Sequence, residues 1–372
     1  MSKQVEYGVF LPVGSGGWIP SLNAPLLDGS YAYNREVTKL SEELGFHFVL
    51  SQATWRGAPG PTRHFMDNLE SLTAAAGFGE ITEQVGLWGT VNTALLHPVV
   101  AAKIITTSDQ ISKGRSGLNI VAGGNRASER QMGIGLTLTN PEKYRLATEW
   151  VQVVKRLWTE DTVSFDGEFF QLDDCQCSPK PVQGIPRMIC AATSEIGLKF
   201  VAENLDGVMF EGITDERVVE LGQRTRRISD QYEAPLQSLC IFMIVPGETD
   251  AEAERRVELY STNKDVVALD HLAQEMGLRS ASNMTDPTSN QTMAADWLNT
   301  MALSTSTIAG SPATIAERLE RLIDDAELDS VIFIMPDFVS DLKIIGEEVL
   351  PILERDGYGS RLTGQYAPLV RA

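Results

Sequence analysis

The stretch SGLNIVAGGNRASERQMGIG, residues 116–135, joins an apolar run of strand length to a glycine-rich loop. Such a loop holds dinucleotide phosphates when it carries G-x-G-x-x-G, with an acidic residue about twenty positions later. Gly123 and Gly124 are adjacent here, and the residues that follow do not reproduce that spacing. The stretch therefore predicts a strand that ends in an open loop. The kind of site that the loop forms has to be inferred from the rest of the chain.

Apolar runs of strand length alternate with longer amphipathic segments on both sides of this stretch. Several runs are apolar throughout, which is typical of parallel strands covered on both faces. This alternation predicts an α/β fold of the (β/α)8 TIM barrel type, with an open doubly wound sheet of two domains as the alternative. The expected strands are 5–13, 46–52, 85–93, 116–123, 187–193, 207–212, 238–247 and 330–336. The expected helices are 34–45, 68–82, 98–112, 141–158, 194–205, 215–232 and 339–356.

Two stretches interrupt the alternation. Residues 159–186 include an expected hairpin at 163–174, because Asp-Gly between β-prone runs is a strong turn signal. Residues 262–310 are rich in Asn, Thr, Ser and Met. Long insertions in a barrel usually lie in its loops, and some of them form active-site lids. We therefore expect residues 1–372 to be a single barrel domain with insertions at about 159–186 and 262–310.

Composition excludes several classes of function. The formal net charge is −19, spread along the chain, so a nucleic-acid partner is not expected. The sequence contains no apolar run of about 18 residues and no secretory leader, which predicts a cytoplasmic protein without a membrane span. Cys175 and Cys177 form C-x-C with no second pair and no nearby histidine, so we expect ordinary thiols and no metal site.

The expected strand ends carry short polar residues and glycine. Thr90 and Thr93 lie on the third strand, Asn119 lies on the fourth, and the fifth runs into Ala-Thr-Ser. The four histidines are scattered, and no H-E-x-x-H, G-x-S-x-G or Walker A motif occurs. Asparagine is depleted in strands and a buried amide needs partners, so Asn119 stands out. A barrel mouth of this kind favours a bound organic cofactor that brings its own reactivity.

Several motifs together resemble the bacterial luciferase-like, flavin-dependent monooxygenases. GRSGLNIVAGG (114–124), ERQMGI, KYRLATEWVQVVKRLW, FDGEFF and CSPKPVQGIPRMICAATSEIG extend this resemblance over nearly the whole chain. Within that family the sequence is most similar to the pyrimidine-ring-opening monooxygenases, with which it shares GVFLPVGSGGW (8–18), DNLESLT (67–73) and MTDPTS (284–289). The resemblance implies a barrel, reduced FMN supplied by a separate flavin reductase, O2 as co-substrate, and a homodimer or homotetramer.

The resemblance also implies positions that contact FMN. Ala53 and Thr54 would lie near the flavin ring, Asn119 would contact its pyrimidine side, and Ser128 falls at a further contact position. Tyr144 and Ser194 would bind the phosphate. Ser194 fits this role on physical grounds as well, because it precedes a helix whose first N–H groups can hold an anion.

Thr90 and Asn119 match the residues that hold O2 at flavin N5 in the pyrimidine enzymes and their relatives. The resemblance therefore implies a flavin-N5 oxygen adduct. Neutral hydrogen-bond donors can stabilise negative charge that develops on oxygen without protonating it outright. Leu50 and Val121 would form the apolar part of the oxygen pocket.

Three positions depart from the pyrimidine enzymes. Those enzymes have lysine at the position of Thr54, tryptophan at the position of Gly124 and an aromatic residue near Met209, and this chain has smaller or more adaptable residues. The departures suggest a wider substrate pocket at Gly124 and Met209. A larger planar N-heterocycle or aromatic compound is expected, for example riboflavin cleaved by an enzyme of the riboflavin lyase type.

Two alternatives remain open. A desulfonating enzyme of the alkanesulfonate type would need a cationic pocket, for which Arg56, Arg63, Arg126 and Arg279 are candidates. The second alternative is a protein with the same barrel fold that binds flavin or deazaflavin without oxygenating a substrate.

Overall fold

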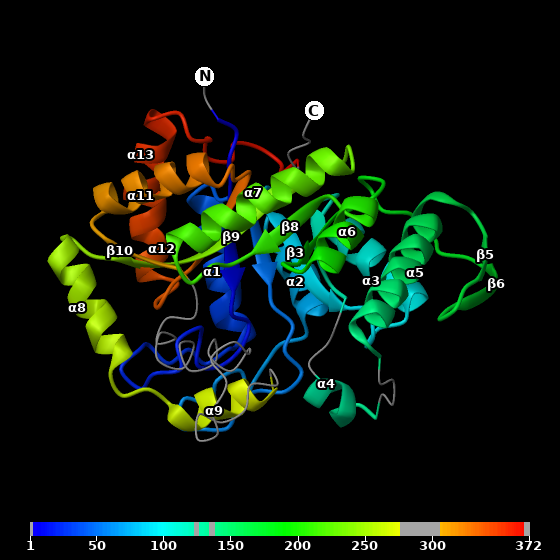
Figure 1. The fold of residues 1–372 in the computed structure, drawn as a ribbon, viewed down its shortest axis with the longest axis horizontal. Helices are drawn as coiled ribbons and strands as arrows, with labels where there is room; N and C mark the ends of the chain where they lie inside the picture. The colour runs from blue at the N-terminus through cyan, green and yellow to red at the C-terminus, as the bar shows by residue number, and fades with distance from the viewer. Residues whose placement is uncertain (1–2, 123–125, 134–137, 276–305, 368–372) are drawn as a thin grey trace.

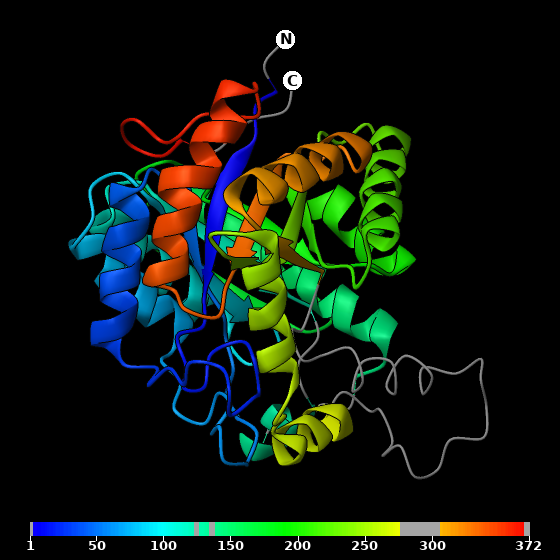
Figure 2. The ribbon, with the colours of Figure 1, turned by 90° about the vertical axis from the view of Figure 1, so that its left-hand side faces the viewer.

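The computed structural model describes residues 3–122, 126–133, 138–275 and 306–367. Eight parallel strands close into a barrel because β8 pairs with both β7 and β9, which confirms the predicted fold (Figure 1). Helices surround the barrel, as Figure 2 also shows. The eight strands are β1 (Glu6–Leu11), β2 (Phe48–Ser51), β3 (Gly86–Asn92), β4 (Ser116–Val121), β7 (Arg187–Ala191), β8 (Gly207–Phe210), β9 (Gln237–Pro246) and β11 (Ser330–Ile334).

The helices follow the strands in sequence and cover the outside of the barrel. Two further helices, α4 and α9, lie at the end of the molecule opposite the two termini (Figure 1). A π-helical turn, Ile345–Val349, joins the last two helices. The helices are α1 (Tyr31–Glu43), α2 (Ser71–Glu80), α3 (Pro98–Ile111), α4 (Arg126–Gln131), α5 (Asn140–Thr159), α6 (Glu195–Asn204), α7 (Asp215–Gln231), α8 (Asp250–Ser261), α9 (Val266–Glu275), α11 (Pro312–Asp325), α12 (Ser340–Ile344) and α13 (Leu350–Arg355).

Both interruptions of the alternation contain regular structure. The expected hairpin is confirmed as the antiparallel pair β5 (Val163–Asp166) and β6 (Gln171–Cys175), which lies at the outer edge of the molecule beside α5 (Figure 1). Between residues 262 and 310 the structure contains α9 and a short strand, β10 (Thr307–Gly310). β10 pairs with the end of β9 and was not predicted.

Two apolar layers hold the fold together. One lies between the strands and the surrounding helices, and the other fills the barrel interior, where the rings of Phe48 and Trp88 stack with centroids 4.2 Å apart. The strands are buried on both faces, as the uniformly apolar runs predict. No helix in the described part of the chain is both long enough and apolar enough to span a membrane.

Candidate active site

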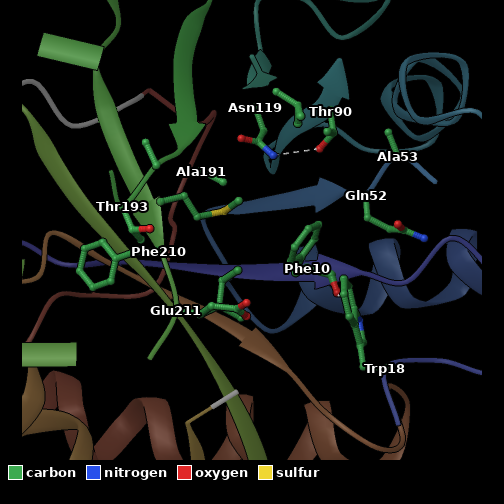
Figure 3. Close-up of a pocket in the computed structure, with 14 residues that line it drawn as sticks. Phe10, Trp18, Gln52, Ala53, Thr90, Asn119, Ala191, Thr193, Phe210 and Glu211 are labelled. Carbon is green, nitrogen blue, oxygen red and sulfur yellow. Dashed lines mark hydrogen bonds between the residues drawn. The ribbon is translucent and has the colours of Figure 1, made fainter. Parts of the chain in front are cut away.

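A cavity of about 460 Å³ opens at the carboxyl ends of the barrel strands, which we call the mouth (Figure 3). Barrel enzymes place their chemistry at this end, and the volume lies within the usual range for ligand pockets of roughly 300–1,000 Å³. The lining residues come from six strands, from the loops that follow them and from the loop after β2. They are Phe10, Trp18, Gln52, Ala53, Thr90, Asn119, Val121, Ala191, Ala192, Thr193, Met209, Phe210, Glu211 and Ile241.

Asn119 and Thr90 face each other across paired strands at the cavity wall (Figure 3). The Asn119 amide Nδ2 donates to Thr90 Oγ1 at 3.3 Å, and both residues are buried. The Asn119 Oδ1 atom is buried and has no hydrogen-bond partner among the described residues. A buried acceptor left without a donor costs about 1–3 kcal/mol, so this oxygen is placed to accept a hydrogen bond from a ligand.

The backbone of Thr90 is fixed from outside the barrel. Its N–H donates to the hydroxyl of Ser71 at 2.8 Å, and that hydroxyl donates to the Ser51 carbonyl at 2.8 Å. Ser71 is the first residue of α2, so one helix start ties the ends of β2 and β3 together. The Thr90 oxygen accepts the hydrogen bond from the Asn119 amide, so the hydroxyl proton of Thr90 remains available to donate to a ligand.

A second group of polar residues lies at the start of α6, directly after Ala192 and Thr193 of the cavity wall. The Ser194 hydroxyl accepts from the Gly197 N–H at 3.2 Å and caps the helix. Tyr144 forms a side-chain hydrogen bond with Ser194. Burial raises the pKa of the Tyr144 phenol, and this hydrogen bond partly offsets the rise. A Cβ on Gly197 would lie 2.6 Å from Tyr144 Oη, so the close approach requires glycine.

Most of the predicted site residues are at the mouth. Ala53, Thr90, Asn119, Val121 and Met209 line the main cavity. A smaller cavity of about 100 Å³ shares Ala53, Thr90 and Val121 and adds Thr54 and Ser128. The Thr54 hydroxyl donates to the Gln52 side chain. Leu50 is fully buried inside the barrel and is not among the lining residues. Gly124 lies outside the described residues.

The sequence patterns did not single out several of the lining residues, among them Phe10, Trp18, Gln52 and Glu211. Gln52 and Glu211 directly follow β2 and β8, so the rule that barrel chemistry follows the strand ends was sufficient to find them. Trp18 lies in a loop that returns over the cavity, and its position depends on tertiary contacts. Its Nε1–H donates to the Phe10 carbonyl at 3.1 Å.

The described arginine candidates for a sulfonate site do not line the main cavity. Arg63 pairs with Asp67 at 2.8 Å on the surface, and Arg56 lines a separate cavity with Trp55 and His271. The Arg279 residue and the Arg126 side chain lie outside what the structure describes. Among the described residues, no group of three or more His, Cys, Asp or Glu side chains is arranged to hold a metal ion.

These features fit a flavin mononucleotide. The unpartnered Asn119 Oδ1 can accept from an N–H of the ring, and the apolar cavity walls suit a planar aromatic system. The start of α6 suits a phosphate, because Ser194 lies there and Gly197 allows the Tyr144 hydroxyl to approach closely.

Comparison with known proteins decides the family. Residues 5–327 match the family described as luciferase-like monooxygenase. The chain belongs to this family. Pyrimidine monooxygenase RutA of Acinetobacter baylyi is 31% identical over 353 residues, covering 94% of this chain and 95% of the relative. Pyrimidine monooxygenase RutA of Escherichia coli O6:K15:H31 is 31% identical over 369 residues, covering 98% and 100% of the two chains.

Solved structures of a riboflavin lyase and of several monooxygenases share this fold. Riboflavin lyase (RcaE), solved with modified FMN and riboflavin, superposes with a TM-score of 0.86 at 19% identity, over 98% of this chain and 94% of the other. Long-chain alkane monooxygenase (LadA) superposes with a TM-score of 0.83 at 18% identity, over 98% and 95%. The predicted family is therefore confirmed, and the protein is a flavin-dependent monooxygenase.

Proposed function

We propose that the enzyme uses reduced FMN and O2 to oxidise or cleave an N-heterocyclic or aromatic substrate. The observation that carries the proposal is the buried Oδ1 of Asn119, which has no hydrogen-bond partner among the described residues and lies beside the Thr90 hydroxyl at the cavity wall. Together the two side chains offer one acceptor and one donor to a ligand, which matches a flavin N–H next to a site of developing negative charge.

The chain's own residues would bind and orient the flavin and would exclude water from the cavity. Asn119 Oδ1 would accept a hydrogen bond from the flavin ring, and the Thr90 hydroxyl would donate to the bound oxygen, which the resemblance expects at flavin N5. Ser194, Tyr144 and the N-terminus of α6 hold the phosphate. Val121 and Ile241 contribute apolar surface that keeps water from the reacting edge. Reduced FMN, when bound, supplies the electrons that activate O2.

The substrate class follows from the relatives and from the cavity. The curated relatives are named pyrimidine monooxygenases, and one structural neighbour holds riboflavin. Met209 lies in the cavity wall, where a flexible side chain can adapt to a larger ring. We therefore propose a pyrimidine-like or larger N-heterocycle, such as riboflavin, as a catabolic substrate.

The remaining parts of the proposal concern organisation. A separate flavin reductase would supply reduced FMN in the cytoplasm. The chain would act as a single barrel domain with its two insertions, assembled into a homodimer or homotetramer. Size-exclusion chromatography with light scattering tests the assembly.

A substrate screen under 18O2 tests the function. The enzyme is mixed with FMN, NADH and a flavin reductase, and mass spectrometry follows uracil, riboflavin and alkanesulfonates. Incorporation of one 18O atom into a heterocycle supports the proposal. Sulfite release would assign the desulfonating activity instead. The non-oxygenase alternative would be assigned by two results together. These are release of H2O2 with no labelled product, and oxidation of a reduced deazaflavin by the enzyme.

A further inference from the structure

Two threonines from neighbouring strands line the same small cavity. Thr54 follows β2 and Thr90 lies on β3, and both contribute to the cavity of about 100 Å³ beside the main one. The Thr90 oxygen accepts from the Asn119 amide, so Thr90 offers its proton to a ligand. What Thr54 offers depends on the group to which its hydroxyl is bonded, which is the side chain of Gln52.

The backbone fixes the orientation of the Gln52 amide. Gln52 lies at the cavity wall on the same side as Ala53 (Figure 3), and only 7% of it is exposed. Its Nε2 donates to the Pro12 carbonyl at 2.8 Å and to Asn68 Oδ1 at 3.0 Å. Because a carbonyl can only accept, the nitrogen end of the amide must face Pro12, and the oxygen end must face Thr54.

The orientation of the Asn68 amide is fixed in the same way. Its Nδ2 donates to the Phe65 carbonyl at 2.9 Å, which leaves Oδ1 to face Gln52. A Cβ on Gly14 would lie 2.1 Å from this oxygen, so the Asn68 side chain is packed closely against the chain there. Two backbone carbonyls therefore set the direction of every hydrogen bond in this chain of side chains as far as Thr54.

Thr54 consequently presents only oxygen lone pairs to a ligand. Its hydroxyl proton is donated to Gln52 Oε1, so its polarity is opposite to that of Thr90. The flavin ring reverses its own polarity at one atom when it is reduced. N5 of the oxidised ring accepts hydrogen bonds, whereas N5 of the reduced ring carries a hydrogen and donates. A threonine that can only accept favours the reduced ring when it lies beside N5.

We propose that Gln52 holds Thr54 as a hydrogen-bond acceptor, and that Thr54 thereby selects reduced FMN over oxidised FMN through the N5–H group. This inference rests on the proposed function, which puts flavin N5 beside Thr90 and hence beside the small cavity. Thr54 contacts the cofactor, and Gln52 is a positioning residue that acts through Thr54. An enzyme that receives reduced FMN from a separate reductase benefits, because oxidised FMN then competes less for the site.

A matched ligand isolates the contribution of N5–H. Reduced 5-deaza-FMN has the shape of reduced FMN but carries carbon in place of N5, so it lacks this donor. Anaerobic isothermal titration should show the wild type binding reduced FMN about three- to tenfold more tightly than reduced 5-deaza-FMN, the size of one neutral hydrogen bond. Thr54→Val keeps the side-chain shape without the hydroxyl and should remove most of this difference.

Further variants separate the hydrogen bond from general loosening of the site. Thr54→Ser keeps the hydroxyl and should retain the preference. Gln52→Leu frees the Thr54 hydroxyl to donate, so oxidised FMN should bind this variant more tightly than the wild type, a gain that a merely loosened site would not show. Thr107→Val removes an exposed hydroxyl on α3 that bonds the Lys103 carbonyl, and it should leave every affinity unchanged. Circular dichroism melting identifies the folded variants, and the Thr54 variants decide the proposal if Gln52→Leu does not fold.

The outcomes distinguish this inference from the proposed function. Loss of the preference in Thr54→Val, with retention in Thr54→Ser, supports the inference. An undiminished preference in Thr54→Val overturns it, as does a wild type that binds the two reduced ligands equally. A folded Gln52→Leu that gains no affinity for oxidised FMN overturns the role of Gln52. The proposed function is judged by 18O incorporation, so labelled product from a wild type without the preference rejects the inference alone, whereas a wild type that binds no flavin rejects both.

Discussion

The buried polar side chains at the two ends of the barrel differ in what surrounds them. At the amino ends of the strands, Arg187 and Glu6 form an ion pair of 2.7 Å, with 4% and 1% of their side chains exposed. Arg187 also donates to the Tyr366 hydroxyl at 3.1 Å and lies 5.0 Å from the centre of the Trp88 ring. We call these four residues the closed-end cluster. At the mouth, Asn119 keeps a buried oxygen without a described partner. The closed-end cluster pairs its buried charges internally and supports stability, although Arg187 Nε and Nη2 have no hydrogen-bond partner among the described residues. Asn119 and Thr90 differ because they line a cavity that can hold a ligand.

The largest expected effect is on stability and follows from Arg187→Met. Removal of one partner leaves the Glu6 charge buried, so we expect a loss of about 3–5 kcal/mol in the free energy of unfolding. Urea denaturation followed by circular dichroism measures it. The flavin affinity of the folded fraction should be unchanged, because the substitution lies at the opposite end from the cavity.

Arg355→Met is the matched control, because Arg355 forms its ion pair with Asp356 on the surface. Its cost should stay within about 1 kcal/mol, as for exposed pairs. The double variant Arg187→Met with Glu6→Gln should recover part of the lost stability. Equal costs for Arg187→Met and Arg355→Met would show that the closed-end cluster does not stabilise the fold.

Asn119→Ala tests the mouth. We expect it to lower activity strongly and stability only slightly, the opposite of Arg187→Met. We expect oxygenation to fall by about 100-fold or more, because the flavin loses its acceptor and Thr90 loses the amide that orients it. Stability should fall by only about 1 kcal/mol, because the one described hydrogen bond lost is that from Nδ2 to Thr90. Thr90→Val should give a similar loss of product. Product formation with reduced FMN and the thermal midpoint are measured together. Near-normal turnover in both variants would exclude them from oxygen activation.

The pH dependence of stability should include a contribution from His64, in the loop between β2 and α2. Burial lowers the pKa of His64 to about 4, although Asp265 acts in the opposite direction. The unfolded chain then binds more protons than the folded protein between about pH 6.5 and 4, so stability falls as the pH is lowered through this window, by up to roughly 3 kcal/mol. His64→Gln should reduce that fall.

Urea denaturation at pH 7 and pH 4.5 measures the difference for each variant. His97→Asn, at an exposed position that keeps a capping acceptor for α3, serves as the control and should alter the difference less than His64→Gln does. An identical fall in His64→Gln and the wild type would mean that His64 does not contribute.

The smallest effect is expected from Gly197→Ala at the start of α6. The added Cβ would displace the Tyr144 hydroxyl from Ser194, so FMN affinity should fall by about tenfold, which corresponds to 1.4 kcal/mol. Riboflavin, which lacks the phosphate, serves as the internal control and should bind as it does to the wild type. Flavin fluorescence titration measures both ligands. Equal losses for the two flavins would place the phosphate elsewhere.

The sequence predicted the barrel well where strands are buried on both faces. The runs at 46–52 and 207–212 are apolar because helices cover one face of each strand and the barrel interior covers the other. Such strands can be recognised from the sequence without knowing which strands lie beside them. The strand ends then indicated Thr90 and Asn119, since barrel chemistry gathers there. β10 was missed because four residues, TIAG, are too short to show a period.

α4, α8, α9 and α11 were not predicted, and two of these helices, α8 and α11, carry clear local signals. α8 follows the capping residue Thr249, and α11 begins with Ser-Pro and has a clear apolar stripe. They fall between expected strands seven and eight, where the alternation of single strands and helices breaks down. The position of Trp18 over the cavity could not be predicted in the same way, because it depends on Phe10 and Phe65 from other parts of the chain.

The pairing of the first strand with the last strand of the barrel has a consequence for synthesis. β1 pairs with β11, so the first strand lacks one neighbour until residue 334 has been made. At about 5–20 residues per second, that delay is roughly 15–65 s. The nascent protein therefore exposes an unpaired strand edge until β11 has been made, and chaperones that bind such edges would be needed during this interval.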